Sequence, residues 1–221
     1  MLRPLLLALL LLAALPAHAE TLLRLSETAH VSVRPDELAA TLAAEAEHAI
    51  AAEAQSRINA AIARALDTAK ATPGVVPATG YYRVWRTGPP NDRWHASQTL
   101  DLHGADGEVL LKLVGTLQAQ GLAVRQLAWR LAPETARRAQ SEATRMALGR
   151  LQARAEEAAA IVGLRFASFR EIRLDGSHSL PGPLPRMAMA AAAAPMAAPV
   201  AEAEDVAVEA SVEADVVLVP K

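Results

Sequence analysis

Hydrophobic and polar residues alternate with a period of two in several segments, which is the pattern of half-buried β-strands. In segment 23–34 the apolar residues from Leu23 to Val33 share one side, and Glu27 is the only exception to that pattern. The alternation is clearest in segment 206–218, so we expect the C-terminal residues to lie in a sheet. The predicted strands are 23–34, 81–85, 94–102, 122–131, 166–174 and 206–218.

Three other segments carry apolar residues at the spacing of one helix face. The predicted helices begin at residue 51, after Asp106 and at Pro133, and they end near Pro73-Gly74, Gly121 and Gly163. The third helix is the longest, and its expected buried stripe is almost entirely alanine: Ala136, Ala139, Ala143, Ala147, Leu151, Ala155, Ala158 and Val162.

Segment 37–47 fits two structures. Its alanines and glutamates favour a helix that continues into residues 51–70, whereas the alternation from Leu38 to Ala46 permits a strand. The pattern of this segment alone leaves both alternatives open.

The first nineteen residues have the features of a secretory signal peptide. Arg3 precedes an almost unbroken Leu/Ala run from Leu5 to Leu15, and Ala17 and Ala19 place small residues before a cleavage point. The run is too short for a membrane span, which needs about 20 apolar residues. We therefore expect cleavage after Ala19 and a protein located in the periplasm.

Composition narrows the class of the remaining chain, residues 20–221. The sequence has no cysteine, which excludes both a disulfide framework and a lipid anchor on a cysteine. The formal net charge is −2, so nothing in the charge predicts a nucleic-acid partner, and no second run is long enough to span a membrane. We expect one domain or two small ones, with a low-complexity, flexible loop at about 176–204 that is rich in Pro, Ala and Met.

The sequence contains no recognisable catalytic motif. His95 and His103 share one side of a predicted strand but lie about 25 Å apart at strand rise, too far to bind one metal ion. Phosphate-binding glycine loops, His-Glu-x-x-His and Gly-x-Ser-x-Gly are all missing. We therefore predict no catalytic residue, no metal site, no cofactor and no enzymatic activity.

Aromatic residues concentrate in the two segments that we expect to form a hairpin around the turn 88–92. The candidates for partner contacts are Tyr81, Tyr82, Trp85 and Trp94. Aromatic side chains bury a large area at low entropic cost, which suits a binding surface. The alternative is that they cover the core or stack across the hairpin.

Five segments, taken in order, carry a family resemblance. They are VSVRPD at 31–36, AQSRIN at 54–59, ASQTL at 96–100, VGL at 162–164 and the alternating C-terminal strand. The chain resembles the SIMPL-domain family of exported bacterial proteins over about residues 22–219, although Glu27 and Ala29 stand where the family usually has glycines. The resemblance implies an α+β fold, with antiparallel β-sheet packed against long Ala-rich helices, and it implies that 37–47 is a strand.

The same resemblance implies a setting in the bacterial envelope, an oligomeric assembly in some members and a link to oxidative stress in others. The leading hypothesis is therefore an exported, non-enzymatic protein that binds an unidentified envelope protein or assembles into a homo-oligomer, through sheet edges and the aromatic hairpin. Two alternatives stay open: a periplasmic enzyme whose site forms only in three dimensions, and a holdase-like chaperone that uses the Ala/Met/Pro loop.

Overall fold

The computed structural model describes residues 20–90, 92–174 and 202–221, and it confirms the predicted α+β class. The segment expected to be a signal peptide and most of the expected loop lie outside these residues. In chain order the elements are β1 (Thr21–Val33), β2 (Glu37–His48), α2 (Ala51–Lys70), β3 (Val75–Arg86), β4 (Trp94–Gly104), α3 (Gly107–Ala119), β5 (Ala123–Arg130), α4 (Pro133–Ile161), β6 (Leu164–Leu174) and β7 (Val206–Pro220).

The described residues form two compact units. Unit 1 contains 20–30, 141–174 and 209–221, and unit 2 contains 31–140, apart from residue 91, and 202–208. Three elements, β1, α4 and β7, contribute residues to both units. No helix within the described ranges is long and apolar enough to cross a membrane.

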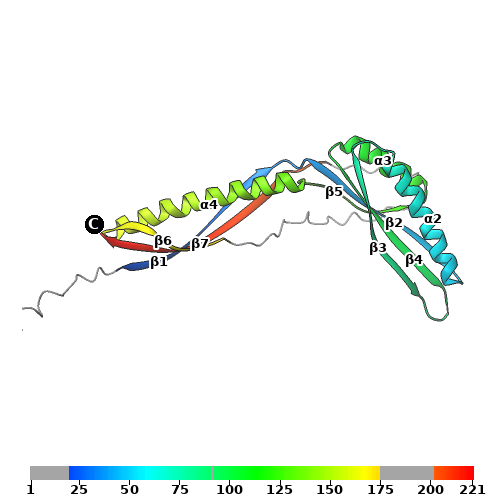
Figure 1. Ribbon diagram of the computed structural model, residues 1–221, viewed down its shortest axis with the longest axis horizontal. Coiled ribbons are helices and arrows are strands. Elements are labelled where there is room, and N and C mark those ends of the chain that lie inside the picture. The colour runs from blue at the N-terminus through cyan, green and yellow to red at the C-terminus, as the bar shows by residue number, and fades with distance from the viewer. Residues whose placement is uncertain (1–19, 91, 175–201) are drawn as a thin grey trace, which may run out of the picture. The chain divides into compact units, whose positions relative to one another are not determined.

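Unit 2 is a four-stranded antiparallel sheet in the order β3-β4-β2-β5, with helices α2 and α3 packed on one face (Figure 1). Residues of β2 and β4 alternate between the two faces, so Leu38 and Leu42 meet Leu100 and Leu102 in the core. Helix α2 adds Ile58 and Ile62 to this core. The other face of the sheet carries polar and charged side chains.

Unit 1 is a three-stranded sheet in the order β1-β7-β6, and α4 lies along one of its faces (Figure 1). Alanines on α4 allow the helix to approach the strands closely, and Ala147 and Ala155 are fully buried against β7. Val212, Ala214, Val216 and Leu218 form the β7 side of this core, as their alternation predicts.

Most predicted elements are confirmed, and the family resemblance was right that 37–47 is a strand. Two details of the sequence interpretation were wrong. Strand β3 begins at Val75 instead of residue 81, because Pro77 and Gly80 obscured its first half. The stripe of α4 continues from Ala155 to Ala159, so Ala158 is only half-buried, and Val162 lies beyond the helix with 60% of its surface exposed.

Candidate functional site

The four aromatic residues singled out in the sequence lie on the β3–β4 hairpin, but they do not form one surface. Tyr81 and Tyr82 are 74% and 41% exposed. Trp94 is paired with Arg86 and packs against the core of unit 2, while the neighbouring residue Trp85 points to the opposite face. Trp94 therefore covers the core, as one alternative from the sequence predicts, whereas the two tyrosines are exposed to solvent.

A β-bulge presents Tyr81 at the outer strand of the sheet. The β3–β4 register shifts between Thr79 and Tyr82, so Gly80 and Tyr81 together oppose Thr99. The Tyr81 backbone N–H donates to Thr99 Oγ1 at 2.8 Å. A Cβ on Gly80 would lie 2.3 Å from that same oxygen, so any other residue here would force the Thr99 side chain to move.

Trp85 is held by a stack on the polar face of the sheet. Its ring lies parallel to the imidazole of His95, with centroids 5.1 Å apart and an angle of 13° between the planes. The Arg83 guanidinium lies 5.0 Å from the Trp85 ring centroid, within the range of a cation–π contact. Thr87 Oγ1 and His95 Nε2 are 3.1 Å apart, which fixes the orientation of the imidazole.

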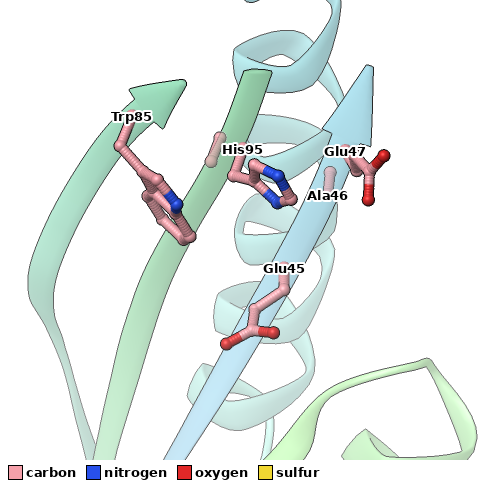
Figure 2. Close-up of a pocket in the computed structure, with 6 residues that line it drawn as sticks. Glu45, Ala46, Glu47, Trp85 and His95 are labelled. Carbon is pink, nitrogen blue, oxygen red and sulfur yellow. The ribbon is translucent and has the colours of Figure 1, made fainter. Parts of the chain in front are cut away.

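A shallow hollow of about 200 Å³ lies beside this stack (Figure 2). Its lining includes the carboxylates of Glu45 and Glu47, and Figure 2 shows the His95 ring between Trp85 and Glu47. Small-molecule sites usually enclose about 300–1,000 Å³. The hollow is therefore smaller than a typical small-molecule site.

The carboxylates at the hollow are neutralised by neighbouring arginines. Glu45 forms an ion pair with Arg125 of β5, and Glu47 lies 3.2 Å from Arg93. These arginines, together with Arg83, leave the rim of the hollow without an excess of negative charge.

Glu37, His103 and Arg130 form a polar cluster that the sequence interpretation missed. Glu37 lies at its centre. It is only 8% exposed, yet one carboxylate oxygen lies 2.7 Å from His103 Nδ1 and the other accepts from Arg130 Nε at 2.6 Å. With both oxygens engaged, this carboxylate joins β2, β4 and β5 instead of serving as a free base. No local signal could have found it, because its partners are 66 and 93 residues away in the sequence.

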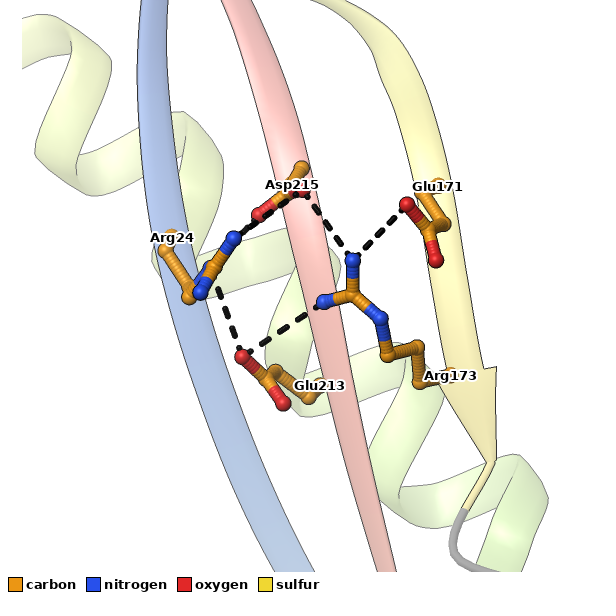
Figure 3. A network of polar contacts seen from close by, with 5 residues as sticks. All are labelled: Arg24, Glu171, Arg173, Glu213 and Asp215. Carbon is orange, nitrogen blue, oxygen red and sulfur yellow. Dashed lines mark hydrogen bonds and ion pairs between the residues drawn. The ribbon is translucent and has the colours of Figure 1, made fainter.

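The polar face of unit 1 carries a charged network across three strands (Figure 3). Arg24 Nε lies 2.8 Å from Asp215 Oδ1, and Arg173 reaches the same carboxylate at 3.5 Å. Glu171 and Glu213 complete the network. Hydrogen bonding from Arg24 lowers the pKa of Asp215, and the same contact raises the pKa of Arg24. The network links β1, β7 and β6, which is a structural role.

Metal ligands do not converge in the part of the chain that the structure describes. Within residues 20–90, 92–174 and 202–221, no group of three or more His, Cys, Asp or Glu side chains is placed to hold a metal ion. The two histidines that share β4 have separate partners, Trp85 for His95 and Glu37 for His103.

Comparison with known proteins identifies a family over most of the chain. The family model described as SIMPL, a protein of unknown function (DUF541), matches residues 23–216. No curated protein matches the chain closely enough to be compared with it.

Proposed function

The chain belongs to the SIMPL family, and from that premise we propose that it is an exported, non-enzymatic envelope protein that works by binding a partner or by self-assembly. The Leu/Ala run at 5–15 and the small residues Ala17 and Ala19 support export to the periplasm. A contribution to oxidative-stress tolerance belongs to the same proposal, as an outcome of binding in the envelope.

The observation that carries this proposal is the exposure of large apolar side chains along β3, an outer strand of unit 2. Val76 is 54% exposed, in addition to the two exposed tyrosines, Tyr81 and Tyr82. Tyrosine is enriched in protein interfaces because its ring is large and its hydroxyl tolerates both water and a partner. The hollow beside Trp85 adds a recess into which a partner side chain fits.

Contacts through side chains are favoured over the addition of a strand to this sheet. Pro77 lies within β3 and lacks a backbone N–H, and the bulge at Gly80-Tyr81 interrupts the ladder. At the other side of the sheet β5 is short, and its pairing with β2 shifts between Thr41 and Leu42. We therefore narrow the proposal from sheet edges in general to the side chains of the aromatic hairpin.

The proposal is tested by affinity capture from envelope extracts with the purified protein as bait. Three baits are compared: the native protein, Tyr81→Ser/Tyr82→Ser, and the control Arg57→Ser/Arg64→Ser on the exposed face of α2. We expect a captured protein, either an envelope component or added tagged copies of the same chain, to be lost only with the tyrosine variant. Equal capture by all three baits would contradict the assignment of the hairpin as the contact surface.

A further inference from the structure

Among the residues that the structure describes, strand β1 is an outer strand of the unit 1 sheet and pairs with β7 alone. An outer strand presents a row of unpaired backbone groups on which another strand can assemble, and proteins usually protect such edges. The face of β1 that carries Leu23, Leu25 and Ala29 packs against α4. Side chains of this neighbouring helix are therefore close enough to reach the outer edge of β1.

Two arginines of α4 reach the backbone of β1. Arg150 Nη1 donates to the carbonyl oxygen of Thr28 at 3.2 Å, and Arg154 Nη1 lies 3.5 Å from the carbonyl oxygen of Ser26. The arginines are four residues apart, which places them on the same side of the helix. The carbonyls are two residues apart, which places them in the same row of the strand.

Arg154 is also fixed by an ion pair with Glu27, whose side chain is only 19% exposed. Glu27 is the residue that breaks the apolar alternation of β1 in the sequence. Its position is explained by this contact, because a carboxylate beside the helix holds the guanidinium over the strand.

We propose that Arg150 and Arg154 close the outer edge of β1 against the addition of β1 from a second copy of this chain. A backbone carbonyl oxygen of β1 that is directed toward β7 lies between two strands. A carbonyl oxygen of β1 that is directed outward is open to a guanidinium that reaches around the edge of the sheet. A guanidinium bound to Thr28 O occupies the acceptor that a new strand needs, and its charge and bulk oppose the approach of an identical edge.

The other outer strand of unit 1, β6, is interrupted along its length by β-bulges. Strand β6 has two register shifts against β7, one between Phe166 and Ser168 and one between Phe169 and Glu171. Bulges of this kind interrupt the regular row of backbone groups along an edge. The proposal is independent of the function proposed for the hairpin, because that surface belongs to unit 2.

The test uses cysteine cross-linking, for which the native chain offers a clean background because it has no cysteine. The single variants Ser26→Cys and His30→Cys are prepared, and each is tested alone and mixed with the other. A symmetric antiparallel β1–β1 pair centred on residue 26, 28 or 30 then brings two thiols together. A disulfide forms only where the Cα atoms approach to about 4.4–6.8 Å, so the yield reports pairing at this edge and not at the hairpin.

Each reporter is placed in three backgrounds: native, Arg150→Ala/Arg154→Ala, and the matched control Arg57→Ala/Arg145→Ala, which removes two exposed helix arginines elsewhere. We expect the disulfide-linked dimer under mild oxidation to rise several-fold in the first double variant only. An equal yield in all three backgrounds would overturn the proposal. Loss of the folded circular dichroism spectrum in the Arg150/Arg154 variant would also overturn it, since these arginines are assigned a protective role and not one in folding.

Discussion

Asp36 shows how one carboxylate can join two parts of unit 2. Its Oδ1 accepts the Ala132 backbone N–H at 2.7 Å, and its Oδ2 accepts the Thr135 hydroxyl at 2.5 Å, so it ties the connection between β1 and β2 to the start of α4. Partial burial raises the pKa of Asp36, but the hydrogen bonds from Thr135 and Ala132, with the charge of Arg138, outweigh it and the pKa lies below its ordinary value.

Asp36→Asn should therefore lower the free energy of unfolding by about 1 kcal/mol near neutral pH, because the amide keeps only one acceptor oxygen and one hydrogen bond is lost. A carboxyl whose pKa is lowered by folding stabilises the protein above its ordinary pKa of 3.8, and this contribution is lost as the pH falls through the lower, folded value. The stability difference between native protein and variant should shrink in acid. Urea unfolding between pH 3 and pH 7 measures it, with the exposed Asp67→Asn as control; a difference that grows in acid would contradict the assignment.

The sequence showed that Asp36 follows a strand and favours a turn, but not what it contacts. Its partners are 96 and 99 residues away, and no local pattern encodes such a distance. The contacts of the aromatic residues in the hairpin could not be predicted from the sequence either. Their concentration was visible in the sequence, but the division of Trp85 and Trp94 between two faces depended on the strand register.

Gly80→Ala should destabilise unit 2 by about 1–3 kcal/mol, as overpacking does in other folded proteins. The added Cβ would lie 2.3 Å from Thr99 Oγ1 and 2.6 Å from Asp101 Oδ2. Moving Thr99 would break its hydrogen bond from the Tyr81 N–H.

Gly115→Ala is the matched control, because a Cβ at this position in α3 meets nothing within 4 Å. Alanine is favoured over glycine in a helix, so this variant should be as stable as the native protein or more so. Thermal unfolding of both variants gives the comparison, and equal stability of Gly80→Ala and Gly115→Ala would show that the bulge tolerates a side chain.

At the scale of elements, alternation and helical stripes located most strands and helices because each buries one face. The exceptions have physical causes: segment 37–47 has alanines that suit either structure, and the first half of β3 contains Pro77 and Gly80. Sheet order was beyond the sequence, because the partners of β2 are β4 and β5 and the partner of β1 is the last strand, β7. The ion pair between Arg24 and Asp215 can be recognised only when the pairing of β1 with β7 is known.

The network on the polar face of unit 1 predicts a salt-dependent contribution to stability. Arg24→Gln removes the contacts to Asp215 and Glu213, so the free energy of unfolding should fall slightly at low ionic strength. The difference should vanish in about 1 M NaCl, where screening is strong. Denaturant unfolding at both ionic strengths measures it, and a loss of equal size in high salt would assign the effect of Arg24 to packing instead.

At the scale of the molecule, residues 20–90, 92–174 and 202–221 form two compact units, and β1, α4 and β7 contribute to both. Periodicity gives the face that each element buries but not the sheet to which it belongs. The length of the chain therefore could not decide between one domain and two small ones. The family match over 23–216 includes residues of both units, so the family pattern describes the pair and not a single sheet.

Export is predicted to remove the first nineteen residues. When the full chain is produced in a bacterium, N-terminal sequencing of the envelope fraction should give Glu20 as the first residue. Ala17→Leu/Ala19→Leu replaces the small residues at the cleavage point and should leave the precursor uncut. Recovery of the native chain in the cytoplasm with Met1 intact would contradict the expected location.

Site-specific photo-cross-linking in the cell envelope tests most directly whether the aromatic hairpin is the contact surface. A photoreactive phenylalanine analogue is placed at Tyr81, with Arg64 on the exposed face of α2 as the control position. We expect a discrete product at Tyr81, either with a second copy of the chain or with one envelope protein, and none at Arg64. The same products at both positions, or none at Tyr81, would contradict it.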